Sequence, residues 1–207
     1  SVQFLYGRMS VVSTGGNTFN LSIEMREVSL YNANWTPPPS QNNPPIYIRL
    51  SGDNQFLNLT LDQCHFQNNS VTTSGVITSS SVMYVEAVYS GWTMTVLHSQ
   101  LINNSQVGAG FGGAISVNCQ ASCHLSFDNV LFRNNSGMSG AGLKINGTVF
   151  LNMVDTTFDT NQVDLTLGVG GGFYCQTLYP MNAGTGSWTW NNVTFLQNKA
   201  FQTAGAY

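Results

Sequence analysis

His-Leu-Ser-Phe-Asp-Asn-Val-Leu-Phe-Arg-Asn-Asn, residues 124–135, is the stretch of this chain whose pattern recurs most clearly. Counted from Phe132, apolar residues stand at minus 7, minus 5 and minus 2, and Asn135 stands at plus 3. Five further segments fit the same frame, with these anchors and plus 3 residues: Phe66 and Asn69, Leu101 and Asn104, Phe158 and Asn161, Phe195 and Asn198, and, in a weaker copy, Leu30 and Ala33. One structural unit therefore repeats along the chain.

The spacing within the frame predicts the shape of one repeat. Alternating apolar residues at minus 7 and minus 5 indicate a strand with one buried face, and the skip to minus 2 requires a bend. Successive anchors lie 36, 35, 31, 26 and 37 residues apart, as in repeats that stack one unit on the next. We therefore expect an all-β chain, a parallel β-helix (β-solenoid) of about six coils, with residues 1–207 as one domain. The alternative is a β-sandwich with chance similarity between its strands.

Stacking gives the two marked positions distinct roles. Equivalent residues of neighbouring coils lie roughly 4.8 Å apart, so the anchors should form an interior column that fills the core. The asparagines at plus 3 should form a second column, in which each amide bonds to backbone groups and to the asparagines above and below. The expected ladder consists of Phe66, Leu101, Phe132, Phe158 and Phe195 with Asn69, Asn104, Asn135, Asn161 and Asn198.

A glycine-rich step leads into the next strand, most clearly at Gly112-Gly113-Ala114-Ile115. A phosphate-binding loop is the alternative, but it needs a following helix, and no helical period follows these glycines. Phe-x-x-Asn combined with Gly-Gly-Ala-Ile resembles the repeat of the polymorphic outer-membrane protein family, found in bacterial adhesins and in large eukaryotic surface proteins. The resemblance covers about residues 20–207, although Leu101 replaces Phe in one copy and only residues 112–115 match Gly-Gly-Ala-Ile strictly. It implies a right-handed parallel β-helix with an adhesive or structural surface role, and it brings no catalytic residues with it.

The composition excludes several classes of function. Charged residues make up 7% of the chain and its net charge is −3, so it has no electrostatic footprint for nucleic acid or for an acidic membrane. No run approaches the roughly 18 apolar residues of a membrane span. The 42% of hydrophobic residues argues against disorder. The chain begins within a strand-like run and stops where another coil should follow, so we expect a segment of a longer solenoid.

The N-terminal quarter combines strands with a proline-rich loop. Residues 2–12 and 19–30 are expected to be strands around a Gly-Gly-Asn turn. Residues 35–45 contain five of the six prolines and show no alternation, which predicts a projecting loop of polyproline character. A docking segment for a partner is the alternative. Alternation resumes at residues 46–50.

Acceptor sequences for N-glycosylation, Asn-x-Ser/Thr, begin at Asn20, Asn34, Asn58, Asn68, Asn103, Asn134, Asn146 and Asn192. Asn68, Asn103 and Asn134 all stand at plus 2, beside the inward asparagine, where a side chain should point to solvent. Three consecutive coils would then carry glycans on one edge, which favours a eukaryotic secreted glycoprotein and would keep an almost uncharged surface soluble. The alternative is a bacterial passenger domain whose asparagine-rich turns produce these sequences by chance.

The four cysteines are expected to differ in role. Cys119 and Cys123 flank a three-residue turn and can close a local disulfide, consistent with secretion. A zinc site formed by these cysteines with His124 is the alternative, although the spacing lacks the usual paired ligands. Cys64 occupies an inward position, and Cys175 lies roughly 14 Å further along the axis, which is too far to bridge. We expect both to be buried free thiols.

Catalysis would require clustered titratable groups. The histidines occupy different positions of their copies: His65, His98 and His124. Asp62 and Asp128 share minus 4 but stand two coils apart with Leu97 between them, whereas Asp155 and Asp159 lie on other edges. A polysaccharide lyase or hydrolase would need a close carboxylate pair, or a Ca²⁺ or oligosaccharide held by Asp62, Asp128 or Asp155. We find no such pair backed by Arg or Lys, and we expect no enzyme, no catalytic residue, no metal and no cofactor.

These patterns together favour a structural extracellular glycoprotein, secreted or at the cell surface. It would be a rod, a stalk or a filament subunit that carries N-glycans and stacks end to end with the rest of its chain or with another copy. The main alternative is an adhesin or carbohydrate-binding module that presents residues 34–45 or 179–187. In that case Trp35, Trp92 or Tyr179 would form an exposed aromatic shelf.

Overall fold

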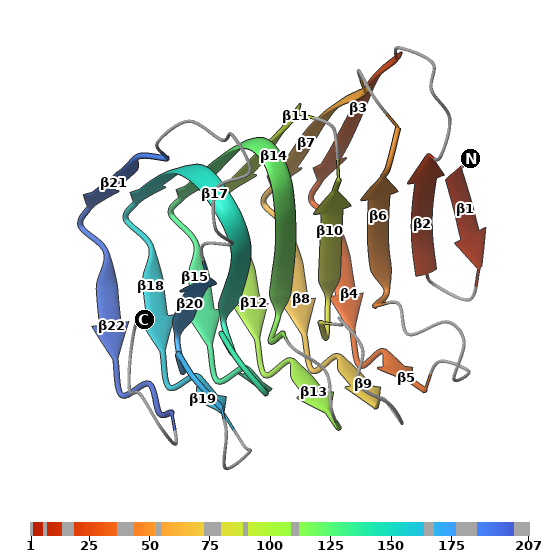
Figure 1. Cartoon of the computed structure of the whole chain (residues 1–207). Helices are drawn as coiled ribbons and strands as arrows, with labels where there is room; N and C mark the ends of the chain where they lie inside the picture. Colours follow the sequence, from red (N-terminus) through yellow and green to blue (C-terminus); the bar gives the residue numbers. More distant parts are fainter. Residues whose placement is uncertain are drawn as a thin grey trace.

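The structure is a computed structural model that describes residues 2–5, 8–13, 19–36, 44–52, 55–72, 80–88, 91–108, 112–163, 168–176 and 186–200. Within these residues the chain is all-β and contains no helix. Its parallel strands stack into a β-solenoid, which confirms the predicted fold class (Figure 1). It follows that the described part has no helix long and apolar enough to cross a lipid bilayer.

The largest sheet folds into two adjoining walls of parallel strands. The first wall contains β2 (Arg8–Ser13), β6 (Ile46–Leu50), β10 (Met83–Ala87), the first parts of β14 (Ile115–Asp128) and β17 (Leu143–Val154), and β20 (Phe173–Gln176). The second wall contains β3 (Phe19–Arg26), β7 (Gln55–Asp62), β11 (Gly91–Leu97), the later parts of β14 and β17, and β21 (Trp188–Asn191). The long strands β14 and β17 therefore belong to both walls.

Two smaller parallel sheets complete the cross-section, so that each coil has four walls. The third wall contains β4 (Ser29–Tyr31), β8 (His65–Gln67), β12 (Gln100–Ile102), β15 (Leu131–Arg133), β18 (Thr157–Asp159) and β22 (Thr194–Leu196). The fourth wall contains β5 (Asn34–Trp35), β9 (Ser70–Thr72), β13 (Ser105–Val107), β16 (Ser136–Gly137) and β19 (Gln162–Val163). Figure 1 shows these ladders running side by side along the solenoid.

The solenoid has about four coils rather than the six that the repeat predicts. The coils with a parallel neighbour on both sides comprise residues 46–72, 83–107, 115–137 and 143–163. Within the described residues, the first and last rungs have a parallel neighbour on one side only. The six copies of the frame therefore form six strands of the third wall but about four complete coils.

Each coil turns two sharp corners, one at each end of the third wall. Among the described residues, twelve that are not glycine have φ between 47° and 56°, and they stand at minus 3 and plus 2 of all six copies. The first corner, at minus 3, is the bend that the skip in the frame predicts. Its residues are Glu27, Gln63, His98, Asn129, Asp155 and Asn192. The second corner is occupied by Asn32, Asn68, Asn103, Asn134, Thr160 and Gln197. Asparagine suits such corners because its short polar side chain tolerates the left-handed conformation.

The anchors of the frame lie in one interior column. The rings of Phe132 and Phe158 stack with centroids 4.8 Å apart, and those of Phe158 and Phe195 with centroids 4.9 Å apart. Leu101 and Phe66 continue the column, because Leu101 pairs in register with Phe132 and Phe66 with Leu101. All of these side chains are buried except that of Phe195, which is half-buried. Each anchor therefore packs against its equivalents on the neighbouring coils.

The N-terminal part differs from the prediction in two places. The expected single strand over residues 2–12 is instead a hairpin, in which β1 (Val2–Leu5) pairs antiparallel with β2 and covers the edge of the first wall. In the expected loop over residues 35–45, Trp35 belongs to β5, and the prolines at 44 and 45 are buried. Residues 37–43 lie outside the described residues.

We predict that Phe132→Ala lowers the free energy of unfolding by about 3–5 kcal/mol, because it leaves a cavity in the anchor column. The control is Phe56→Ala, which removes a side chain that is 43% exposed on the outer face of β7. Urea denaturation at 25 °C followed by circular dichroism measures both changes. Equal losses for the two variants would contradict the stacked interior column.

Candidate functional site: corner ladders and outer faces

The asparagines at plus 3 form a ladder of amides inside the second corner. Asn104 shows its bonding: its side-chain nitrogen donates to the carbonyl of Phe66 at 2.9 Å and to Asn135 Oδ1 at 3.0 Å. Its Oδ1 accepts from the backbone and side-chain nitrogens of Asn69 at 3.2 and 2.9 Å. The same bonds recur from coil to coil, from the Ala33 amide to Asn198.

Three amides of this ladder, those of Asn104, Asn135 and Asn161, use their full hydrogen-bonding capacity. A side-chain amide offers two donors and two acceptor lone pairs, and Asn104 uses all four within the protein. Asn69, Asn104, Asn135 and Asn161 are fully buried. Because an unsatisfied buried polar group costs about 1–3 kcal/mol, the asparagine holds the corner only if the neighbouring coils are in register.

A second ladder runs along the outside of the same corner. The side-chain nitrogens of Asn68, Asn103 and Asn134 each donate to the Oδ1 of the corner asparagine on the preceding coil, at 3.1, 3.1 and 2.8 Å. All three side chains are exposed, and all three begin a glycosylation sequence. The structure therefore brings these three predicted sites onto one solvent-facing edge.

The other predicted glycosylation sites are spread over several surfaces. Exposed side chains are found at Asn20, Asn34, Asn58 and Asn192. Asn192 occupies a corner and donates to Asp155 Oδ1 at 2.6 Å. Asn146 differs from the rest, because it is half-buried and its Oδ1 is buried without a hydrogen-bond partner. Asn146 is therefore the least accessible of the eight positions.

The cysteines fall into a bonded pair and two free thiols. Cys119 and Cys123 form a disulfide across the irregular segment of β14, with their Cα atoms 6.2 Å apart. Both sulfur atoms are thereby used, so the alternative zinc site with His124 lacks its thiolate ligands. Cys64 is buried, but Cys175 is half-buried rather than fully buried as expected. Burial raises the pKa of both thiols, that of Cys175 to about 11.

The carboxylates considered for catalysis lie apart. Asp62 and Asp128 are in register with Leu97 on the coil between them. Asp62 has two basic neighbours that the sequence did not reveal. Arg26 Nε lies 3.5 Å and His98 Nδ1 lies 3.2 Å from its carboxylate. Asp159 Oδ2 lies 2.8 Å from Arg133 Nε and its Oδ1 accepts from Thr160 Oγ1, while Asp155 accepts from Asn192. Within the described residues no three His, Cys, Asp or Glu side chains are placed to hold a metal ion.

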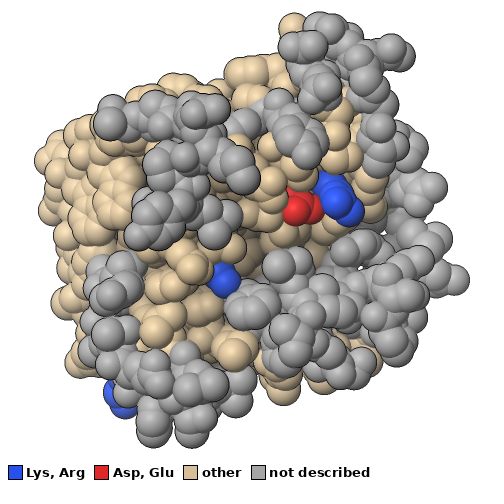
Figure 2. Space-filling view, in the orientation of Figure 1, with Lys and Arg blue, Asp and Glu red and all other residues tan. Residues whose placement is uncertain are grey.

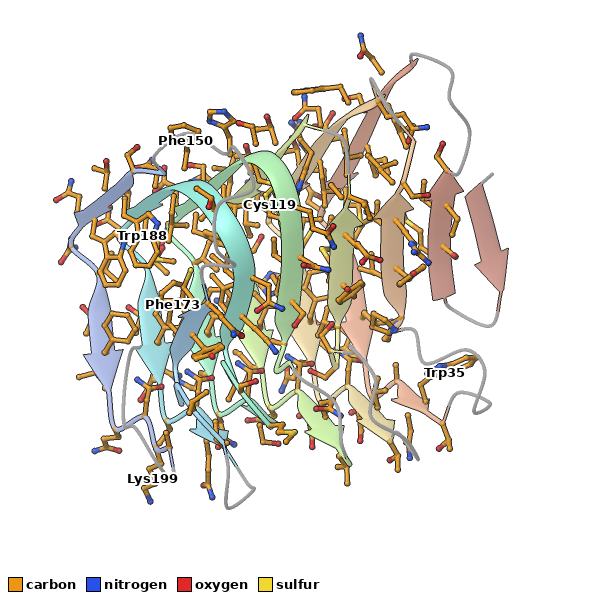
Figure 3. All side chains as sticks on the ribbon, in the orientation of Figure 1. Trp35, Cys119, Phe150, Phe173, Trp188 and Lys199 are labelled. Atoms are coloured by element: carbon orange, nitrogen blue, oxygen red, sulfur yellow. A yellow bond between two sulfur atoms is a disulfide. The ribbon has the colours of Figure 1, made fainter. Side chains whose placement is uncertain are left out.

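The aromatic shelf of the adhesin alternative does not include Trp92. Trp92 points into the core and is completely buried, because it occupies an inward position of β11. Trp35 is half-buried in β5 (Figure 3). Tyr179 and most of residues 179–187 lie outside the described residues.

Surface charge is sparse. On the face shown in Figure 2, the charged side chains are widely separated, with the exception of one acidic–basic pair.

An outward-facing row of the first wall is buried, which the sequence pattern did not predict. Tyr84, Ser116 and Lys144 alternate with core residues along their strands and so point away from the core, yet they are only 4–5% exposed. Lys144 Nζ lies 5.9 Å from the ring centroid of Tyr174. Burial lowers the pKa of Lys144 to about 8.

Both ends of the described solenoid expose apolar interior. At the first rung, a cavity of about 670 Å³ is lined mainly by apolar side chains such as Leu21, Ile23 and Leu30, with Glu24 and Arg26 also at its lining. At the last rung, Trp188 and Trp190 stack with centroids 6.1 Å apart and are 46% and 40% exposed. In the interior coils, neighbouring coils cover the equivalent side chains. The end rungs therefore present apolar surface that no neighbouring coil covers.

The chain matches no protein family model, no curated protein and no solved structure. The similarity of its repeat to the polymorphic outer-membrane proteins is therefore confined to the quoted motifs. The class of protein that the coordinates define is a parallel β-solenoid of about four turns.

We predict that Asn135→Ala lowers the free energy of unfolding by about 3 kcal/mol, because it leaves several buried donors and acceptors of the neighbouring coils unpaired. The matched control is Asn134→Gly, which removes the adjacent exposed amide at a corner with φ of 51° that glycine adopts freely. Urea denaturation measures both variants. A larger loss for Asn134→Gly than for Asn135→Ala would contradict the structural role of the inner ladder.

We predict that Lys144→Met raises the free energy of unfolding at pH 7, on the order of 2–3 kcal/mol. The unfolded chain keeps the lysine proton up to a pKa of 10.5, whereas the folded chain loses it near 8. Folding therefore releases a proton between these values, so the stability contributed by Lys144 rises with pH in this window. Urea denaturation of both proteins from pH 6 to pH 10.5 measures the difference, which should shrink above pH 8. A difference that is independent of pH would contradict the assigned burial of the amine.

Proposed function

We propose that this chain is a structural segment of an extracellular glycoprotein, serving as a rod, a stalk or a filament subunit. The observation that supports this most directly is the buried amide ladder from Asn69 to Asn198. The side-chain amides of Asn104, Asn135 and Asn161 are buried and are fully used between coils. Such a ladder gives a stiff, directional scaffold in which each coil is the template for the next.

The extracellular placement rests on covalent chemistry. The disulfide between Cys119 and Cys123 is of a kind that persists in oxidising compartments. Glycosylation sequences are exposed at most of their positions, and three of them share one edge of the second corner. The resemblance of the repeat to surface proteins agrees with this location. N-glycans would also supply the hydration that so few charged side chains provide.

The exposed apolar ends support stacking of a further coil, from the same chain or from another copy. Trp188 and Trp190 occupy positions that interior coils cover, and the cavity at the first rung is also apolar. Exposed edges of parallel sheets bind further strands readily. End-to-end stacking would bury these side chains and continue the ladders.

The alternatives have less support. A polysaccharide lyase or hydrolase would need a carboxylate pair, whereas Asp62 and Asp128 are separated by a coil. An adhesin with an aromatic shelf at Trp92 is contradicted by the burial of this residue. The absence of enzymatic activity stays a prediction.

We predict that, in chain secreted from a eukaryotic host, Asn68, Asn103 and Asn134 carry glycans but never all three in one molecule. Neighbouring coils are roughly 4.8 Å apart, which is less than the width of a sugar ring with its hydration, so a glycan on Asn103 excludes its neighbours. Intact mass before and after enzymatic deglycosylation, with peptide mapping in heavy-oxygen water, measures the occupancy.

The control variant is Ser105→Ala, which removes the sequence for Asn103 and leaves the corner amide in place. Occupancy at Asn68 and Asn134 should rise in this variant, and that at the isolated site Asn58 should not change. A chain without any glycan would contradict the proposed function. Simultaneous occupancy of all three corners would contradict the exclusion rule alone.

A further inference from the structure

A shallow groove on the outer face of the second wall combines an aromatic platform with uncharged polar groups. Its volume is about 240 Å³, and it extends across β11, β14, β17 and β21. The rings of His124 and Phe150 stack with centroids 4.6 Å apart and planes 7° apart. Both side chains face away from the core, because Leu125 and Leu151 beside them point inward. Figure 3 shows Phe150 on the outside of the solenoid.

Within the described part of the chain, the stack of rings ends at Phe150. The next rung places Ser187 beside it, since the backbone nitrogen of Leu151 donates to the Ser187 carbonyl at 2.8 Å. Serine supplies no ring, so one face of Phe150 is not covered by a stacked neighbour from this rung. A flat ligand whose thickness matches the spacing between two coils, roughly 4.8 Å, fits at that face and would continue the column of rings.

The polar groups around this face are hydroxyls and amides. Ser126, Asn152, Ser187 and Thr189 line the groove, and Asn152, Ser187 and Thr189 are exposed. Asn152 donates one N–H to Ser126 Oγ at 3.4 Å, which leaves its oxygen and second N–H facing solvent. Among the described residues, the lining contains no Asp, Glu, Lys or Arg, so these residues offer no fixed charge to an ionic ligand.

We propose that this groove binds a neutral hexopyranose ring, either free or as one unit of a glycan. One face of a pyranose presents C–H groups, which are attracted to the negative face of an aromatic ring, and its hydroxyl rim matches the amide and hydroxyl groups of the groove. The volume lies below the roughly 300–1,000 Å³ of drug-sized sites, which suits a single sugar ring.

The chain holds one potential source of this sugar in the same column. Asn58, which begins a glycosylation sequence, is in register with Thr93, and Thr93 is in register with His124 and through it with Phe150. Asn58 is therefore two coils from His124 and three from Phe150, so a glycan on Asn58 would emerge roughly 14 Å along the axis from Phe150. The site takes the same chemistry from this glycan or from a separate saccharide.

The test uses glycan-free chain and methyl β-D-galactopyranoside and methyl β-D-glucopyranoside as probes, with saturation-transfer NMR and titration of the aromatic signals. The expected result is transfer from the protein to the C–H face of at least one probe. Phe150→Ala should weaken this binding about tenfold or more, and Phe150→Tyr should retain it. Phe56→Ala, an exposed ring of the same wall outside the groove, should leave it unchanged. Far-UV circular dichroism verifies that each variant is folded.

The source of the sugar is distinguished by glycosylated chain and its Thr60→Ala variant, which lacks the Asn58 sequence. If the chain's own glycan occupies the groove, free probe binds only the variant; equal binding to both indicates a separate saccharide. The proposal is overturned if neither probe binds the glycan-free chain or if Phe150→Ala has no effect on binding. It is also overturned if p-cresol, a mimic of an aromatic side chain, binds at Phe150 while both sugars do not. Its failure would leave the structural role and the glycan measurements untouched.

Discussion

The hydrogen bonds between the side-chain amides of consecutive coils are the constraint on which the rest of the structure depends. Each buried asparagine at plus 3 accepts from the backbone of one coil and donates to the carbonyl and amide of its neighbours. A shift of one residue in any coil would leave these groups unpaired in a dry interior, at a cost that a marginally stable fold does not tolerate. The amide ladder therefore fixes the register of every other column.

Register fixed at one corner explains why coils of unequal length stack. Successive anchors are 36, 35, 31, 26 and 37 residues apart, yet the strands between minus 7 and plus 3 superpose residue for residue. The surplus residues lie in two places: between the fourth wall of one coil and the first wall of the next, and, in the longest repeat, also between β20 and β21. In the step from the fourth wall to the first, the backbones of neighbouring coils come into close contact at Gly113. A Cβ added at Gly113 would lie 1.7 Å from the Ala141 carbonyl oxygen, so only glycine fits at that step.

The sequence predicted those features that depend on residues close together in the chain, and it missed those that depend on contacts between distant residues. The anchor column, the inward asparagines and the separation of Asp62 from Asp128 all come from residues with fixed offsets within one frame. The outward row of Lys144, the contact of His98 with Asp62 and the burial of Trp92 were missed. These three features depend on contacts between different coils or on the burial of the outer face of a wall. The antiparallel β1 was missed for a related reason, since a hairpin at the edge of a solenoid breaks no pattern within the repeat.

The sequence by itself determined that this protein is a stack of β-coils, because the repeated frame specifies one buried face and two corners in every copy. Only the tertiary structure decided how many copies become complete coils and which outward side chains are buried. It alone placed His124, Phe150 and Ser187 on consecutive rungs of one groove. The physical reason is that local alternation sets the direction in which a side chain points. Its neighbours are set by coil stacking, which joins residues some 26 to 37 positions apart.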